Sequence, residues 1–217
     1  MKLKKPLICL PMAITMAVCM LVSSAANAQR FSAGIIGGVN ACQIDGDDLA
    51  GYDKLGLTAG LKAILNLESR VDFNVEFLYS QRGSRPDIFN PDYDPDINIS
   101  LHYVELPVYI SLGDWWQEEG KYYKVSAQAG LSYARLINAS TFDYYHPSDM
   151  NLDRLVPYFN NNDLSWLLGL SYRMGPHWGI SGRYTRGITP LLSPKKHNLN
   201  TQKLISYFIS LRLEYYF

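Results

Sequence analysis

The stretch that decides the fold is the last fifteen residues, Lys203 to Phe217, which read KLISYFISLRLEYYF. Every second residue is apolar, and this row runs unbroken to the terminal phenylalanine: Ile205, Tyr207, Ile209, Leu211, Leu213, Tyr215 and Phe217. The other row includes two serines, one arginine and one glutamate. Because successive side chains of a strand point to opposite faces, the two faces of this strand should meet different surroundings.

A strand that ends on an outward aromatic residue at the C terminus resembles the C-terminal recognition strand of bacterial outer-membrane barrels. In those proteins the terminal phenylalanine and the alternate apolar residues are read by the assembly machinery. We therefore assign Leu213, Tyr215 and Phe217 to a candidate assembly signal. The alternative is an ordinary strand of a soluble sandwich, because this pattern alone does not distinguish lipid from a second sheet.

The N terminus has the pattern of a secretory signal peptide. Three lysines among the first five residues precede an apolar run over about residues 7–22, and Ala26-Asn27-Ala28 is a small-x-small cleavage site. We expect residues 1–28 to be removed and residues 29–217 to form one outer-membrane barrel domain. Cys19 follows Val18 rather than a small residue, which argues against a lipid-anchored N terminus.

Composition limits the remaining classes of protein. Three of the 20 basic residues lie in the signal peptide, which leaves 17 against 20 acidic residues and argues against nucleic acid as a partner. Cys42 is the only cysteine after residue 28, so neither an intramolecular disulfide nor a cysteine metal site is expected. No later apolar run approaches the roughly twenty residues of a membrane-spanning helix, so contact with a membrane would require a closed barrel.

Eight segments of the mature chain alternate apolar and polar residues. They cover about residues 30–41, 55–67, 71–82, 101–112, 122–137, 164–173, 178–187 and 203–217. The connections between them are alternately short and long, as in bacterial barrels with tight periplasmic turns and longer extracellular loops. We predict an all-β protein, an eight-stranded antiparallel up-and-down transmembrane β-barrel.

The polar face of these segments would carry charges into the barrel interior. Six bases and four acids are predicted to form a lumen charge network: Lys62, Asp72, Glu76, Arg82, Glu105, Lys124, Arg173, Arg183, Arg212 and Glu214. Because side chains fill the interior of an eight-stranded barrel, no porin-like channel is expected. Glu76 and Glu105 should lie close together, each in contact with at least one inward base, and an arginine fork could bridge them.

Two turns can be predicted from the parity of the inward residues. These are odd-numbered on both sides of Gly175–His177, so an odd turn is required and a three-residue turn fits. The same parity around Leu67–Ser69 places Lys62 opposite Asn74 and diagonal to Asp72.

Two local features are expected in the segment after residue 100. Pro107 lies in the inward row of a predicted strand and has no backbone N–H, so we expect a bulge or a locally broken pair there. Gly113–Gly120, which contains Trp115 and Trp116, is expected to be a short turn with interfacial aromatic side chains.

Four stretches of the mature chain carry a family pattern. They are SAGIIGG at residues 32–38, EFLYSQRG at 76–83, YVELPVYI at 103–110 and the terminal aromatic strand. Together they resemble the PorT-like outer-membrane β-barrel family of Bacteroidetes, and the resemblance covers the whole mature chain. It implies an eight-stranded barrel in the outer membrane. One namesake of that family is associated with type IX secretion and gliding, but fold resemblance alone does not transfer secretion.

The histidines are the residues in which an enzymatic site would be sought. His102, His146, His177 and His197 fall at a strand end, in a long loop, in a short turn and in another loop. They are not expected to converge with a serine on one mouth of the barrel, and His102 with a neighbouring serine or aspartate is the remaining candidate.

The connection after residue 83 is the place where a metal site would be sought. Asp92, Asp94, Asp96 and Asn98 alternate and offer oxygen ligands for calcium, but the glycine turn and the glutamate of an EF-hand-type site are missing. We favour solvated loop charge, and we expect no catalytic, cofactor-binding or metal residues.

The sequence therefore predicts an integral outer-membrane barrel with a filled lumen and a structural, binding or assembly role, neither a bulk diffusion porin nor an enzyme. Its expected partners are outer-membrane lipid, the barrel-assembly machinery and an unidentified protein at the extracellular loops. The first alternative is a barrel enzyme, a lipid or peptide hydrolase with its site at the extracellular mouth. The second is a soluble periplasmic barrel of lipocalin type, which requires an apolar interior and a polar exterior.

Overall fold

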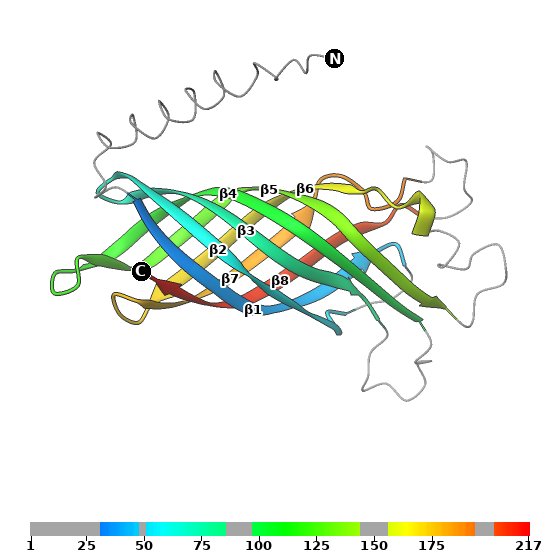
Figure 1. The fold of residues 1–217 in the computed structure, drawn as a ribbon, viewed down its shortest axis with the longest axis horizontal. Helices are drawn as coiled ribbons and strands as arrows, with labels where there is room; N and C mark the ends of the chain where they lie inside the picture. Colours follow the sequence, from blue (N-terminus) through cyan, green and yellow to red (C-terminus); the bar gives the residue numbers. More distant parts are fainter. Residues whose placement is uncertain (1–30, 48–50, 86–96, 144–155, 194–201) are drawn as a thin grey trace, which may run out of the picture. The chain divides into compact units, whose positions relative to one another are not determined.

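A computed structural model of the 217-residue chain describes residues 31–47, 51–85, 97–143, 156–193 and 202–217. Within these ranges the strands are β1 (Phe31–Asp45), β2 (Lys54–Glu68), β3 (Val71–Ser84), β4 (Ile97–Gln117), β5 (Tyr122–Asp143), β6 (Asn162–Arg173), β7 (Trp178–Gly187) and β8 (Ile205–Tyr216), and a short 3-10 helix, η3 (Val156–Tyr158), precedes β6. The strands pair antiparallel in chain order, and β1 also pairs with β8, which closes the barrel (Figure 1). The predicted all-β, eight-stranded up-and-down barrel is confirmed. Among the described residues, no helix is both long and apolar enough to cross a membrane.

The period-two pattern of the sequence becomes the two faces of the barrel wall. In β8, Leu211 and Leu213 are 63% and 46% exposed, whereas Arg212 between them is 2% exposed. In β2, Leu57 and Leu61 are likewise exposed on either side of the buried Thr58. Apolar side chains therefore cover the outside and polar side chains line much of the inside, the reverse of a soluble lipocalin-type barrel.

Short and long connections lie at opposite ends of the barrel. Residues 69–70, 118–121 and 174–177 form the short turns, and residues 46–53, 85–96, 144–161 and 188–204 form the long connections. We call these ends the turn end and the loop end, and the C terminus lies at the turn end (Figure 1). Within residues 174–177, Met174 N donates to Trp178 O at 2.9 Å in register with the pair Arg173–Gly179, so the hydrogen-bonded ladder encloses Gly175–His177 and the predicted three-residue turn is confirmed.

The predicted register between β2 and β3 is wrong by one inward position. Lys62 pairs with Glu76 and not with Asn74, which lies opposite Ile64. The cause is an irregularity between Asn66 and Glu68, which takes up one residue of β2 and moves the tip of the turn to residues 69–70. The parity is preserved, so inward residues still face inward.

Pro107 interrupts the β3–β4 ladder only locally. Val75 pairs with Val108 and Leu78 pairs with Glu105 on the same register, with no ladder pair between them. This confirms the locally broken pair expected from a residue without a backbone N–H.

The turn expected over residues 113–120 is shorter in the structure. β4 continues to Gln117, and Trp116 pairs with Tyr123 of β5 with ring centroids 4.8 Å apart. Because aromatic cross-strand pairs stabilise a sheet, the ladder extends to these residues and the turn contracts to residues 118–121.

Aromatic side chains cluster on the outer surface toward both ends of the wall. Near the turn end, Tyr215 packs against Trp178 and Phe217, with centroid distances of 5.0 and 5.6 Å. Toward the loop end, Trp166 packs against Tyr184 at 5.3 Å. An apolar band with aromatic girdles at its two edges is the arrangement of a barrel that spans a bilayer.

A buried apolar cluster occupies the loop end, and we call it the loop-end core. Its members are Ile44, Ile99, Leu101, Tyr103, Ala134, Phe159, Leu191, Leu192 and Leu204. Leu192 comes from the β7–β8 connection and forms an isolated bridge with Leu204, while Phe159 directly follows η3. Segments outside the strands therefore fold over this end and bury apolar surface there.

Candidate functional site

The inner charges form two networks, of which the first, the central network, joins four strands. Glu76 of β3 accepts from Arg183 Nη1 of β7 at 2.9 Å and from Arg212 Nη1 of β8 at 3.0 Å. Arg212 also contacts Glu214 at 3.1 Å, and Lys62 of β2 contacts Glu214 at 2.8 Å. Two acids and three bases are thereby connected across the lumen.

Neutral donors complete the two acids of the central network. Tyr109 donates its hydroxyl to Glu76 Oε1 at 2.5 Å. Ser181 and Tyr216 donate to the two oxygens of Glu214 at 2.5 and 2.7 Å. Every carboxylate oxygen of Glu76 and Glu214 thus accepts at least two hydrogen bonds, which leaves these acids fixed and charge-compensated.

The second network, the loop-side network, is centred on Arg82, which is 0% exposed. Its guanidinium donates to Glu105 Oε2 at 2.6 Å and to Asp163 Oδ2 at 2.7 Å. Its central carbon also lies 4.7 Å from the centroid of the Tyr103 ring and 4.3 Å from that of Phe208. Two carboxylates and two aromatic rings close to the guanidinium account for a fully buried cation.

Glu76 and Glu105 each contact an inward base, but the predicted arginine bridge between them is absent from the described part of the chain. Glu76 forms ion pairs with Arg183 and Arg212. Glu105 forms an ion pair with Arg82 and accepts a hydrogen bond from the Ser132 hydroxyl at 2.6 Å. The two acids therefore belong to separate networks.

Three residues of the predicted network lie apart from these ion pairs. Lys124 Nζ lies 5.0 Å from the centroid of the Trp115 ring, and the Arg173 guanidinium lies 3.8 Å from the centroid of Tyr216. Asp72 accepts a hydrogen bond from Asn66 at 2.6 Å. All three are half-buried toward the turn end, where water can replace a charged partner.

Sequence reasoning missed Asp163. The strand was predicted to begin at Leu164, which left Asp163 in the preceding loop. Asp163 nevertheless has the same parity as Ser165, which is 1% exposed and donates to Asp163 at 3.0 Å. Continuing the inward row of this strand by two residues, from Ser165 back to Asp163, would have predicted that Asp163 faces the lumen.

Comparison with known proteins identifies the family. The family described as outer membrane protein beta-barrel domain matches residues 24–193. The chain belongs to this family. As a member of an outer-membrane barrel family, the protein faces the lipid of the outer membrane with its apolar belt.

Solved structures of outer-membrane barrels resemble this one at low sequence identity. Ail, the attachment invasion locus protein of Yersinia pestis, is 13% identical over 87% of this chain and 99% of that chain, with a TM-score of 0.45. Neisserial surface protein A is 12% identical over 85% and 97%, with a TM-score of 0.47. OprG from Pseudomonas aeruginosa is 12% identical over 87% and 97%, with a TM-score of 0.41. No curated protein matches the sequence.

The described histidines of this outer-membrane barrel lie at opposite ends. His102 Nδ1 shares a hydrogen bond with Tyr79 OH on the exposed face, and His177 Nδ1 contacts Tyr216 O at 2.9 Å in a turn. His146 and His197 lie outside the described residues. The alternative of a hydrolase at the extracellular mouth stays a hypothesis.

The candidate calcium ligands Asp92, Asp94 and Asp96 also lie outside the described residues. Within the described ranges, no group of three or more histidine, cysteine, aspartate or glutamate side chains is arranged to hold a metal ion.

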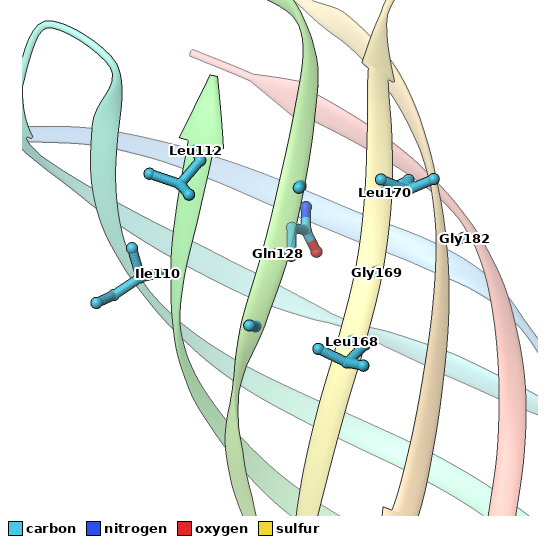
Figure 2. A pocket seen from close by; sticks show the side chains of 9 residues that line it. Ile110, Leu112, Gln128, Leu168, Gly169, Leu170 and Gly182 are labelled. Atoms are coloured by element: carbon cyan, nitrogen blue, oxygen red, sulfur yellow. The ribbon is translucent and has the colours of Figure 1, made fainter. Parts of the chain in front are cut away.

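The outer surface of this outer-membrane barrel is grooved over β5. Ala127 lies between Leu112 and Leu170 across the sheet, and Ala129 lies between Ile110 and Leu168 (Figure 2). The small alanines between larger neighbours create a shallow apolar groove. It lies within the lipid-facing belt, where an acyl chain fits its chemistry.

Proposed function

We propose that this protein is a sealed outer-membrane barrel with a structural or binding role, and that it is neither a diffusion porin nor an enzyme. The observation that carries this proposal is the position of Glu76. From β3 it binds arginines of β7 and β8, strands that are not its neighbours in the barrel, so the ion pairs cross the lumen.

Burial supports the seal. Glu76 and Glu214 are 1% exposed and Arg212 is 2% exposed. The loop-side network and the loop-end core add further layers toward the extracellular end. An eight-stranded barrel is only about wide enough for its own side chains, so these layers leave no water-filled path for bulk solutes.

The proposal includes export and assembly of the barrel. Cleavage after Ala28 would release a mature chain that begins at Gln29. Leu213 on the outer face of β8 and Phe217 directly after β8 are exposed, which suits their proposed reading by the assembly machinery. The finer PorT-like relationship rests on the sequence stretches quoted above.

Planar-bilayer recording tests the seal. The purified, folded protein should insert without steady conductance at the scale of a porin. A known porin purified and reconstituted in the same way is the positive control. Steady porin-sized conductance from this protein would overturn the proposal.

A further inference from the structure

A polar pocket opens at the extracellular rim of the barrel wall. Arg135, Tyr158, Asn160 and Asn162 are among the residues that line it, and its volume is about 280 Å³. This lies just below the range of about 300–1,000 Å³ typical of small-molecule pockets, which suits one small polar group rather than a long chain.

Backbone hydrogen bonds fix the floor of this rim pocket. Leu136 N of β5 donates to Asn161 O at 2.8 Å, and Asn160 N donates to Leu191 O at 2.7 Å. The Asn160–Asn162 segment is thereby attached both to the barrel wall and to the loop-end core. The pocket is therefore held in shape by the fold itself.

The orientation of two side-chain amides follows from their partners. Asn162 Oδ1 accepts from Tyr133 OH at 2.8 Å and from Arg135 Nη1 at 2.7 Å. Asn160 Oδ1 accepts from the backbone N–H of Asn162 at 3.2 Å. With their oxygens engaged, both amides present their NH₂ groups, which can only donate.

Arg135 makes the rim pocket cationic. It lies on the exposed face of β5, and no carboxylate within the described ranges forms an ion pair with it. Its guanidinium donates one hydrogen bond to Asn162 Oδ1. The planar guanidinium has further N–H donors, whose geometry matches a carboxylate or a phosphate. Tyr158, which is also exposed, lines the same pocket.

We propose that the rim pocket binds an acidic saccharide. The acid group, a carboxylate or a phosphate, would pair with Arg135, and sugar hydroxyls would accept from Asn160 and Asn162. The saccharide could be free or could be the phosphorylated headgroup of an outer-leaflet glycolipid, since both offer the same chemistry. This inference rests on the proposed binding role of the barrel.

Two variants and one matched control test the site. Arg135→Gln removes the cation. Asn162→Asp keeps oxygen acceptors for Tyr133 and Arg135, but it replaces the donating NH₂ group by an anion, so the fold is retained while the ligand is repelled. Arg186→Gln is the control, because Arg186 is a partly exposed rim arginine that faces Asp45 at 3.7 Å and lies outside the pocket.

The binding assay uses the full mature protein in nanodiscs. In neutral phosphatidylcholine discs, an oligogalacturonate should bind the parent protein, and a neutral galacto-oligosaccharide of equal length should bind more weakly. In a second arm, diphosphorylated lipid A is added to the discs and its retention by the protein is measured. Binding of the oligogalacturonate in the first arm identifies the ligand as a free acidic glycan. Binding of lipid A in the second arm, without binding in the first, identifies it as a glycolipid headgroup.

In the arm that binds, Arg135→Gln and Asn162→Asp should each lower affinity about tenfold or more, the loss expected for a charge-assisted hydrogen bond, while Arg186→Gln leaves affinity unchanged. Binding in neither arm, equal binding of the neutral sugar, or equal loss in Arg186→Gln would overturn the proposal. The sealed-barrel proposal is tested separately by conductance. If the protein shows no porin-sized conductance and also binds no acidic saccharide, the saccharide site is refuted and the sealed-barrel proposal is not.

Discussion

Replacing Glu76 by glutamine should strongly destabilise the barrel, because Glu76 accepts from two buried arginines at once. Arg212 keeps Glu214 as a partner in the variant. Arg183 loses its carboxylate partner and keeps only neutral acceptors, the side-chain oxygen of Gln128 at 3.1 Å and the amide oxygen of the introduced glutamine. Breaking a buried ion pair by removing one partner costs about 3–5 kcal/mol, because the other charge stays desolvated and uncompensated.

Urea unfolding in lipid vesicles, followed by the mobility of folded and unfolded protein on a gel, measures this loss. With a slope of roughly 2–3 kcal/mol per molar urea, a loss of about 3 kcal/mol lowers the midpoint by about 1 M or more. Asp72→Asn is the matched control, since Asp72 is half-buried and hydrogen-bonded to a neutral amide, and its loss should stay below about 1 kcal/mol.

A third variant isolates the cause of the loss. Adding Arg183→Met to Glu76→Gln removes the stranded base, so the double variant should regain part of the stability. If Glu76→Gln unfolded at the same urea concentration as Asp72→Asn, the ion pairs across the lumen would contribute little and the reasoning would be refuted.

Three further outcomes are expected. Unheated and boiled samples should migrate differently on a denaturing gel; equal migration together with release from membranes by carbonate would contradict an integral barrel. Deleting Phe217 should leave unfolded protein in the periplasm while protein refolded in detergent is nearly normal, and unchanged assembly in cells would count against a recognition role. Mass spectrometry of the mature protein should find Gln29 at its N terminus, and an intact residue 1–28 segment in the outer membrane would disprove cleavage.

The fold was predictable because the bilayer imposes a simple rule on the wall. Lipid outside and side chains inside require alternation, and Leu211, Arg212 and Leu213 display it without any knowledge of their neighbours. Whether inward residues are odd- or even-numbered can also be read from two adjacent segments alone, which is why the turn at Gly175–His177 was predicted correctly.

Register and partner choice were harder because they depend on distant events. One irregular residue near Leu67 moved Lys62 from Asn74 to Glu76. Asp163 meets Arg82 only through closure of the whole barrel. Leu191 and Leu192 sit in a connection that reads as polar, and their burial becomes visible only when Leu204 lies beside them.

The contacts from β8 to β2 and β3 have a consequence for how the barrel closes. A slip of β8 by two residues against β1 would keep Leu211 and Leu213 on the lipid side, so the outer surface could not detect the error. The same slip would move Arg212 and Glu214 along the strand direction by about 7 Å, beyond ion-pair reach of Glu76 and Lys62. Several registers of β8 against β1 would therefore present the same apolar surface to lipid. We infer that the buried ion pairs select the native register among them, because only in that register does each buried charge have its partner.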